Sequence, residues 1–88
     1  MQYNIRWAKP ALKALNKMSI VDKEAIRRKM FQIAADPYTS HTNVKTLMGG
    51  KNGLYRLRHG NWRILYSVDN GELLILVVDI GHRKEVYK

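Results

Sequence analysis

The first residues of the chain alternate between apolar and polar side chains. In residues 2–7, Tyr3, Ile5 and Trp7 are separated by single polar residues. Side chains leave a strand on alternate sides, so a period of two predicts a strand with one buried face. We therefore expect the chain to begin with a half-buried strand over residues 2–7.

The pattern then changes to helical spacing. Pro10 stands at a position that the first turn of a helix tolerates, and apolar residues recur from there to Met18. A second helix is predicted from Ser19, which with Asp22 resembles a capping pair. Proline cannot continue a helix, so this helix should end just before Pro37.

The second half of the chain is predicted to consist of strands. Apolar segments predict strands at residues 44–47, 54–59, 62–68 and 73–80. Tight turns at Gly60-Asn61 and at Asp69-Asn70-Gly71 should join the last three strands into consecutive hairpins.

These elements predict an α+β fold in a single domain of residues 1–88. The expected architecture is an N-terminal strand and two helices packed on one face of a largely antiparallel sheet of four to five strands. Both helices precede the hairpins, so we expect them to cover the same face. The other face of the sheet is then available for function.

Charge and composition narrow the function. The 88 residues include 16 Lys and Arg against 7 Asp and Glu, a formal net charge of +9. A charge of that sign and size favours polyanions and acidic protein partners. The chain has no cysteine, and His41, His59 and His82 lack the spacing of a metal site, so we expect neither a metal nor a cofactor. Residues 1–7 lack the apolar run of a signal peptide, and the longest apolar run, residues 73–78, is too short to cross a bilayer. We therefore expect a cytoplasmic protein with no membrane partner.

The basic residues are spread over both halves of the chain, but in the second half several arginines have a spacing that suits a site. Arg56 and Arg58 are two residues apart on one predicted strand, so both leave the same face. Adjacent like charges repel, which suits an anion site better than a structural surface. Arg63 lies on the next strand, and a basic cluster at residues 81–84 follows the last one.

Each of these features also has a structural interpretation. Arginines at a period of two often form the solvated face of a strand. Trp62, Tyr66 and Tyr3 suit core packing better than base stacking, and His59 suits a turn. Arginines that fork onto phosphate, together with aromatic rings that stack on unpaired bases, are nevertheless typical of RNA-binding proteins.

Two motifs resemble those of one toxin family. The sequence of residues 54–66, LYRLRHGNWRILY, resembles the Y-R-x-R-x-G-x-x-R-x-x-Y core of RelE-type toxins. The sequence of residues 81–87, GHRKEVY, resembles their C-terminal G-H-R-x-x-V-Y signature. The chain therefore resembles the RelE/ParE superfamily of toxin–antitoxin systems over essentially its whole length.

The resemblance implies an endoribonuclease, or mRNA interferase. RelE-type toxins enter the A site of the 30S ribosomal subunit, cut mRNA there without a metal, and so inhibit translation. The 2′-hydroxyl attacks the adjacent phosphate and leaves a 2′,3′-cyclic phosphate and a 5′-hydroxyl. The implied partner is an acidic, RelB-like antitoxin, through which alone the toxin would bind operator DNA.

The resemblance also implies roles for single residues. Arg56 and Arg58 match two basic strand residues of the family, and Arg63 matches its phosphate-stabilising arginine. Arg83 matches the C-terminal basic catalytic residue, and Tyr87 matches the tyrosine that stacks on or orients the substrate.

Proton transfer is the part of the mechanism with open alternatives. His82 matches a histidine present in many members, and an imidazole donates a proton near neutral pH far more readily than arginine. We therefore favour His82 as the general acid, with Arg83 as the alternative. The base is unassigned: Glu85 and Tyr87 are the candidates, and the alternative is that there is no strong base and that orientation by the ribosome supplies much of the rate. Further RNA contacts are expected from Lys45, Lys51 and Lys84.

Two other functions stay open. ParE-type toxins resemble this fold but poison DNA gyrase, and they typically lack the full basic and aromatic set that is present here. A non-catalytic RNA-binding module would use the same arginines only to bind. The complete set of basic and aromatic residues favours the nuclease.

Overall fold

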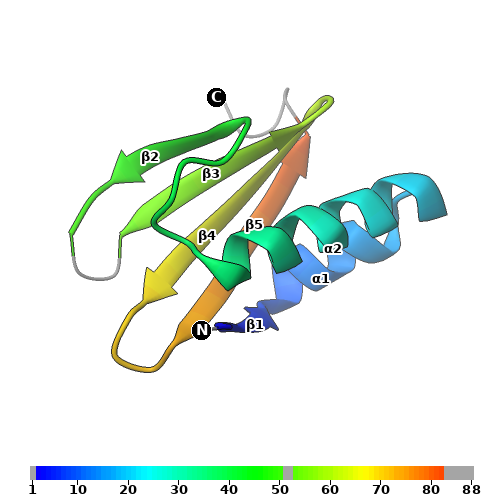
Figure 1. Cartoon of the computed structure of the whole chain (residues 1–88). Coiled ribbons are helices and arrows are strands. Elements are labelled where there is room, and N and C mark those ends of the chain that lie inside the picture. The colour runs from blue at the N-terminus through cyan, green and yellow to red at the C-terminus, as the bar shows by residue number, and fades with distance from the viewer. Residues whose placement is uncertain (1, 51–52, 83–88) are drawn as a thin grey trace.

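The computed structural model describes residues 2–50 and 53–82 of the chain. Figure 1 shows two helices lying along one side of a single sheet. In chain order the elements are β1 (Asn4–Trp7), α1 (Lys9–Asn16), α2 (Ile20–Ala35), β2 (Val44–Met48), β3 (Leu54–His59), β4 (Trp62–Asp69) and β5 (Leu74–His82). The predicted order of one strand, two helices and further strands is confirmed.

The strands lie in the order β1-β5-β4-β3-β2. β3, β4 and β5 pair antiparallel in sequence order, as the hairpin turns predict, and β2 also pairs antiparallel with β3. β1 instead runs parallel to β5, with Asn4 opposite Leu74 and Trp7 opposite Val77. Since a parallel pair cannot be joined by a tight turn, β1 can reach this edge only because a long segment with both helices follows it. The sheet is therefore five-stranded and largely antiparallel.

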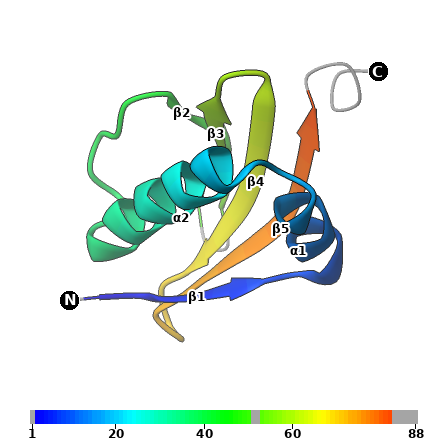
Figure 2. The same cartoon turned by 90° about the vertical axis from the view of Figure 1, so that its right-hand side faces the viewer.

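Both helices cover the same face of the sheet, as Figure 2 shows. Leu15 of α1 and Ile26 and Met30 of α2 are fully buried in one cluster with Ile64 and Tyr66 of β4. Because side chains alternate along a strand, Leu65, which lies between Ile64 and Tyr66, points to the opposite face. No helix covers that face among the described residues.

The ends of α2 follow the sequence signals. Ser19 Oγ accepts a hydrogen bond of 3.2 Å from the backbone N–H of Asp22, so the predicted serine cap is present. The helix ends at Ala35, before Asp36 and Pro37. Within the described ranges, no helix is long and apolar enough to span a membrane.

β5 is longer than the sequence predicts. The expected strand ends at residue 80 and a turn follows, whereas β5 continues through Gly81 and His82. These two residues pair with Arg63 and Trp62, so the ladder with β4 extends to the end of the strand. His82 is therefore a strand residue, and the alternation of the strand fixes the side on which its ring leaves the sheet.

Candidate functional site

The candidate site lies on the sheet face that the helices leave uncovered. Leu57 of β3 is buried in the core, so Arg56 and Arg58 leave the sheet on the other side. Arg58 lies directly opposite Arg63 of β4, and Arg56 lies directly opposite Lys45 of β2. Directly opposite residues share a face. We call these four residues, Lys45, Arg56, Arg58 and Arg63, the basic corner.

Arg63 is the most buried member of the basic corner. It is only 6% exposed, whereas Arg58 is exposed. The Nη1 group of Arg63 donates to the backbone oxygens of Gly60 and Trp62, both at 3.3 Å. Opposite Arg63 on β5 stands Gly81, which adds no side chain beside the guanidinium. The turn between β3 and β4 thus holds this positive charge in place before a ligand arrives.

Basic residues lie together on three neighbouring strands, the arrangement that an anion site requires. Like charges directly opposite each other destabilise a sheet, so the arrangement opposes folding. Guanidinium groups fork onto phosphate oxygens, and a charge held in place stabilises negative charge that develops during a reaction. The basic corner can therefore bind a phosphodiester and stabilise its transition state.

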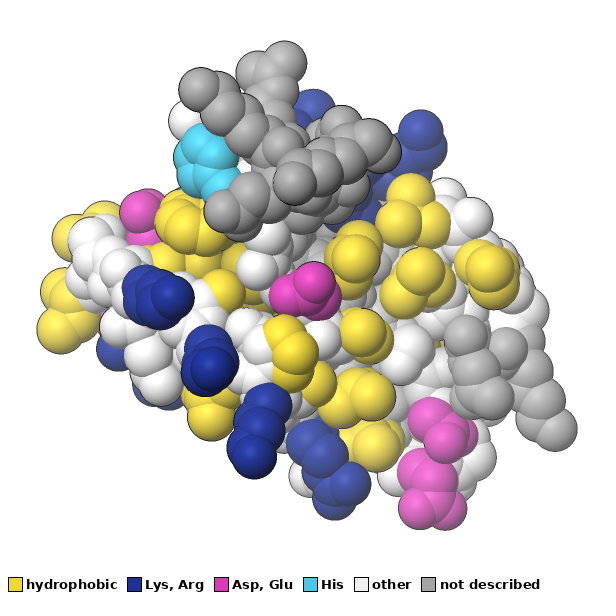
Figure 3. Space-filling model, turned by 180° about the vertical axis from the view of Figure 1, so that it is seen from behind, with side chains coloured by type: hydrophobic (Ala, Val, Ile, Leu, Met, Phe, Trp, Pro, Cys, Tyr) yellow, Lys and Arg dark blue, Asp and Glu magenta, His cyan; other side chains and the backbone are white. Residues whose placement is uncertain are grey.

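The rest of the uncovered face is largely apolar. Leu54, Leu65 and Leu76 are half-buried there, and Val78 is 38% exposed. Figure 3 shows hydrophobic side chains gathered over the middle of this face, and Arg56 of the basic corner lies directly opposite Leu65. An apolar surface that adjoins a basic one is typical of a protein-binding surface.

His82 lies on the other side of the sheet. It pairs with Trp62, which is in step with the buried Ile64 and so faces the helices. The rings of Trp62 and His82 meet edge to face, with their centroids 5.3 Å apart. The structure therefore does not bring His82 together with Arg58 and Arg63, which weakens its case as proton donor to a phosphate at the basic corner.

Several predicted site residues lie outside the described residues. These are Lys51, Arg83, Lys84 and Tyr87, together with the candidate base Glu85. Their roles stay predictions. The described residues of the basic corner are therefore those predicted to stabilise charge, and none of them is a predicted proton-transfer group.

His59 makes a contact that the sequence does not predict. Its Nε2 lies 3.2 Å from Oδ1 of Asp22, and its Nδ1 lies 3.3 Å from Nζ of Lys29. The ring thereby joins the end of β3 to two turns of α2. Strand alternation places His59 on the helix side, because it is two residues after Leu57, but it does not identify Asp22 and Lys29 as the partners.

Tyr66 belongs to the core, as the sequence predicts. It is 0% exposed and stacks on Tyr55, with the ring centroids 5.4 Å apart. Burial, and secondarily the neighbouring Tyr55, raises the pKa of the Tyr66 phenol well above its ordinary value. The hydroxyl is buried without a hydrogen-bond partner in the described part of the chain. Tyr66 is therefore not available to stack on a base.

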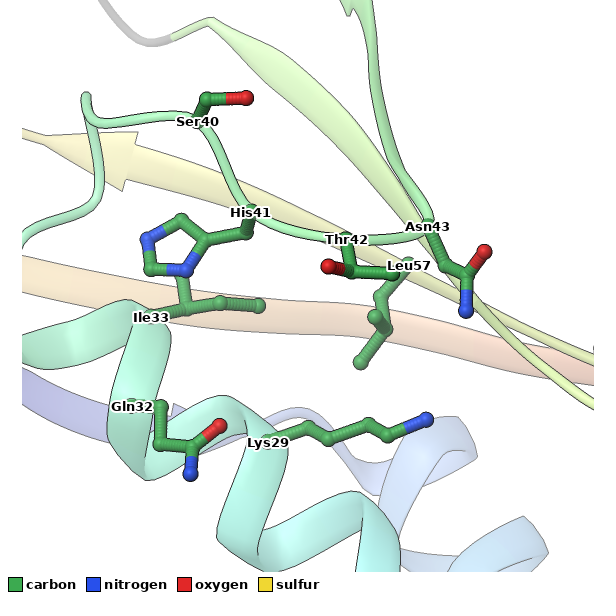
Figure 4. Close-up of a pocket in the computed structure, with 8 residues that line it drawn as sticks. All are labelled: Lys29, Gln32, Ile33, Ser40, His41, Thr42, Asn43 and Leu57. Carbon is green, nitrogen blue, oxygen red and sulfur yellow. The ribbon is translucent and has the colours of Figure 1, made fainter.

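A polar cavity of about 260 Å³ lies between α2 and the connection to β2 (Figure 4). Gln32 and Thr42 border it from the helix and the connection, and Ile33 and Leu57 form its apolar wall. Because Leu57 faces the helices, the cavity is on the opposite side of the sheet from Arg58. It is therefore separate from the basic corner.

The sequence and the fold are similar to those of known toxins. The family model of the ParE toxin of type II toxin–antitoxin systems matches residues 5–87. The chain matches no curated protein. The archaeal RelE–RelB complex from Pyrococcus horikoshii OT3 contains a chain that is 25% identical, with a TM-score of 0.85, and the match covers 98% of this chain and 100% of that one.

Two bacterial structures have the same fold at lower similarity. The toxin–antitoxin complex RelBE2 from Mycobacterium tuberculosis contains a chain that is 23% identical, with a TM-score of 0.74, and the match covers 94% of this chain and 100% of that one. The isolated E. coli RelE toxin in its P21 form is 24% identical over 97% and 90%, with a TM-score of 0.75. Since the ParE family model spans nearly the whole chain, the protein belongs to the ParE toxin family of type II toxin–antitoxin systems, within the RelE/ParE superfamily.

Proposed function

We propose that this toxin is a metal-independent endoribonuclease that cuts mRNA in the ribosomal A site. The observation that carries the proposal is the placement of Arg58 directly opposite Arg63 on the uncovered sheet face. Such a pair opposes folding, and a phosphate is the ligand that makes it favourable. Similarity to RelE structures supports the same reaction class.

In the proposed reaction, the 2′-oxygen forms a bond to phosphorus as the bond to the 5′-oxygen breaks. The products are a 2′,3′-cyclic phosphate and a 5′-hydroxyl. The transition state carries additional negative charge on the non-bridging oxygens of the phosphate. Arg63, which two carbonyls hold in place, and the exposed Arg58 stabilise that charge, while Lys45 and Arg56 bind the flanking backbone.

Proton transfer in this proposal uses the C-terminal residues. A base takes the proton of the 2′-hydroxyl, and an acid protonates the departing 5′-oxygen. Because His82 leaves the sheet on the side away from Arg58, we assign the acid to Arg83 and the base to Glu85 or Tyr87. Near neutral pH an arginine side chain gives up its proton only with difficulty, and a tyrosine phenol is protonated and so is a poor base. Orientation of the mRNA by the ribosome therefore supplies much of the rate.

A second candidate function is inhibition of DNA gyrase. The family model that matches the chain is that of ParE toxins, and ParE-type toxins act on gyrase. A gyrase inhibitor has no phosphodiester to cleave, so gyrase inhibition gives no reason for two opposed arginines, one of which is held by backbone carbonyls. We favour the nuclease on that ground.

We also propose an acidic antitoxin as the partner of this toxin. Two similar structures are complexes of RelE with RelB. The chain has a net charge of +9, and its uncovered sheet face combines the basic corner with exposed apolar side chains. An acidic segment that folds onto this face would neutralise the charge and cover the apolar surface. Operator DNA would be bound through the antitoxin.

Induction of the toxin in cells separates these candidates. Primer extension should find cuts within translated mRNA, and Arg58→Gln should abolish them. Arg28→Gln removes one exposed arginine from the outer side of α2 and should leave the cuts unchanged. Intact mRNA together with relaxed plasmid DNA would instead support gyrase inhibition. RNA binding without any cut would support a binding module only.

A further inference from the structure

A second surface combines basic and aromatic side chains, on the side of the sheet that the helices cover. A cavity of about 540 Å³ lies between α1 and the adjoining ends of β4 and β5. Trp62, Ile80 and His82 line it from the sheet, and Lys13 and Lys17 line it from the helix side. Ligand sites typically have volumes of about 300–1,000 Å³. The cavity is therefore large enough for a small organic ligand.

One stripe of α1 borders this cavity. Pro10, Lys13, Ala14 and Lys17 are three or four residues apart, so they lie along one side of the helix and its C-terminal cap. Ala14 has a short side chain, which leaves the space between the two lysines open toward the sheet. None of the described residues that line the cavity is acidic. The stripe thus presents two positive charges that no carboxylate in the lining neutralises.

Trp62 contributes a flat apolar surface to the cavity. The residue is half-buried and packs against the core. The edge-to-face contact with His82, at 5.3 Å between ring centroids, further restricts the orientation of the indole. A ring that is already held loses little conformational entropy when another ring stacks on it. Base stacking on such rings is a general means of binding single-stranded nucleic acid.

We propose that this cavity binds one unpaired nucleotide of RNA, with the base on Trp62 and the phosphate between Lys13 and Lys17. An acidic peptide would use the lysines but would leave the indole surface without an aromatic partner, so the combination favours a nucleotide. The inference rests on the proposed function because it takes RNA as the ligand. The cavity and the basic corner lie on opposite sides of the sheet, so each can be altered without changing the other.

Binding of a labelled, short single-stranded RNA to the full toxin, followed by fluorescence anisotropy without ribosomes, tests this inference. Trp62→Leu keeps an apolar residue but removes the ring, and should weaken binding about tenfold. Trp62→Phe should retain most of the affinity. Lys13→Gln with Lys17→Gln should weaken binding and should lower the slope of log affinity against log salt concentration by about 0.7 for each phosphate that the variant no longer neutralises.

Matched controls separate a site from general attraction between a basic protein and RNA. Arg27→Gln with Arg28→Gln removes the same amount of charge from the exposed side of α2 and should leave the affinity nearly unchanged. Circular dichroism confirms that each variant folds. A second measurement needs no change at Trp62: RNA should quench tryptophan fluorescence in Trp7→Phe toxin.

Three results would overturn the inference. These are an equal loss of affinity in the two double variants, unchanged affinity in folded Trp62→Leu, and absence of quenching. Loss of affinity for an acidic antitoxin peptide but not for RNA would identify a protein-docking site and would also overturn it. If RNA binds through Trp62 but the toxin does not cut mRNA in the A site, only the proposed nuclease function is contradicted. If the toxin cuts mRNA but Trp62→Leu leaves RNA affinity unchanged, only this inference is contradicted.

Discussion

Arg58 of β3 and Arg63 of β4 lie directly opposite each other, on the face of the sheet that no helix covers in the described structure. Like charges at directly opposite positions destabilise a sheet, in the range of about 0.2–1 kcal/mol per pair. A bound polyanion would turn this repulsion into attraction for both side chains. The pair therefore indicates a surface that suits ligand binding, although it lowers the stability of the fold.

The first prediction concerns the stability of the Arg58→Gln variant. Removing the exposed partner relieves the repulsion, so the free energy of unfolding should stay unchanged or rise by up to about 1 kcal/mol. Urea denaturation followed by circular dichroism measures the change. Arg28→Gln, on the outer side of α2, serves as the control. A clear loss of stability in Arg58→Gln alone would show that Arg58 is structural and would remove the argument for an anion site.

The second prediction concerns His82. A general acid contributes about 10²–10⁴ to a reaction rate. Because the ring of His82 lies on the helix side with Trp62, His82→Gln should have a much smaller effect on the single-turnover cleavage rate at saturating toxin. Its main effect should be on RNA affinity, since it borders the Trp62 cavity. A rate loss of the full size, with altered pH dependence, would restore His82 as the proton donor.

The third prediction concerns the buried hydroxyl of Tyr66. This group has no hydrogen-bond partner among the described residues, and an unsatisfied buried polar group costs about 1–3 kcal/mol. Tyr66→Phe should therefore raise the free energy of unfolding, or leave it unchanged, with the core intact. A loss of stability would reveal a partner for the hydroxyl, such as a buried water.

The Tyr66→Phe substitution should also change how the free energy of unfolding depends on pH in alkaline solution. Burial raises the pKa of the Tyr66 phenol in the folded chain, whereas in the unfolded chain the phenol ionises near its ordinary pKa of about 10. Above that pH the unfolded chain binds one proton fewer, so this residue makes stability fall by about 1.4 kcal/mol per pH unit. Tyr66→Phe should lack that contribution. Parallel stability curves for the two proteins above pH 10 would contradict this account.

The fourth prediction concerns the entry into β3. A Cβ added at Gly53 would lie 2.8 Å from the backbone oxygen of Met48, which cannot move away as a flexible side chain can. Gly53→Ala should therefore cost about 1–3 kcal/mol of stability, as overpacking does. Gly49→Ala is the matched control, because nothing lies within 4 Å of its added carbon. Equal urea midpoints for the two variants would show that β2 and β3 can separate at little cost.

Local patterns predict most of this fold. The period of two in residues 2–7, the Ser19 cap and the break at Pro37 act through neighbouring residues, so each is readable in the sequence. The common face of Arg56 and Arg58 follows from strand alternation in the same way. The placement of Arg56 and Arg58 on one side of the sheet was therefore predictable.

Features that depend on distant partners were not predictable. The parallel pairing of β1 with β5 depends on how the helices return the chain to the sheet. The direction of His82 depends on the continuation of β5 beside Trp62, and the contact of His59 with Asp22 joins residues far apart in sequence. The cavity at Trp62 likewise exists only because α1 packs beside β5. Alternation assigns a side chain to a face, but tertiary packing decides what it meets there.

Cleavage of mRNA on purified ribosomes tests the central claim most directly. The toxin, Arg58→Gln and Arg28→Gln are each mixed with ribosomes that hold an mRNA with an empty A site, and the rate and the chemistry of the new 3′ ends are measured. We predict 2′,3′-cyclic phosphate ends, a rate loss of about 10²–10³ in Arg58→Gln, as for loss of one group that stabilises a charged transition state, and none in Arg28→Gln. Equal rates in all three proteins, or no cleavage by the unmodified toxin, would contradict the account.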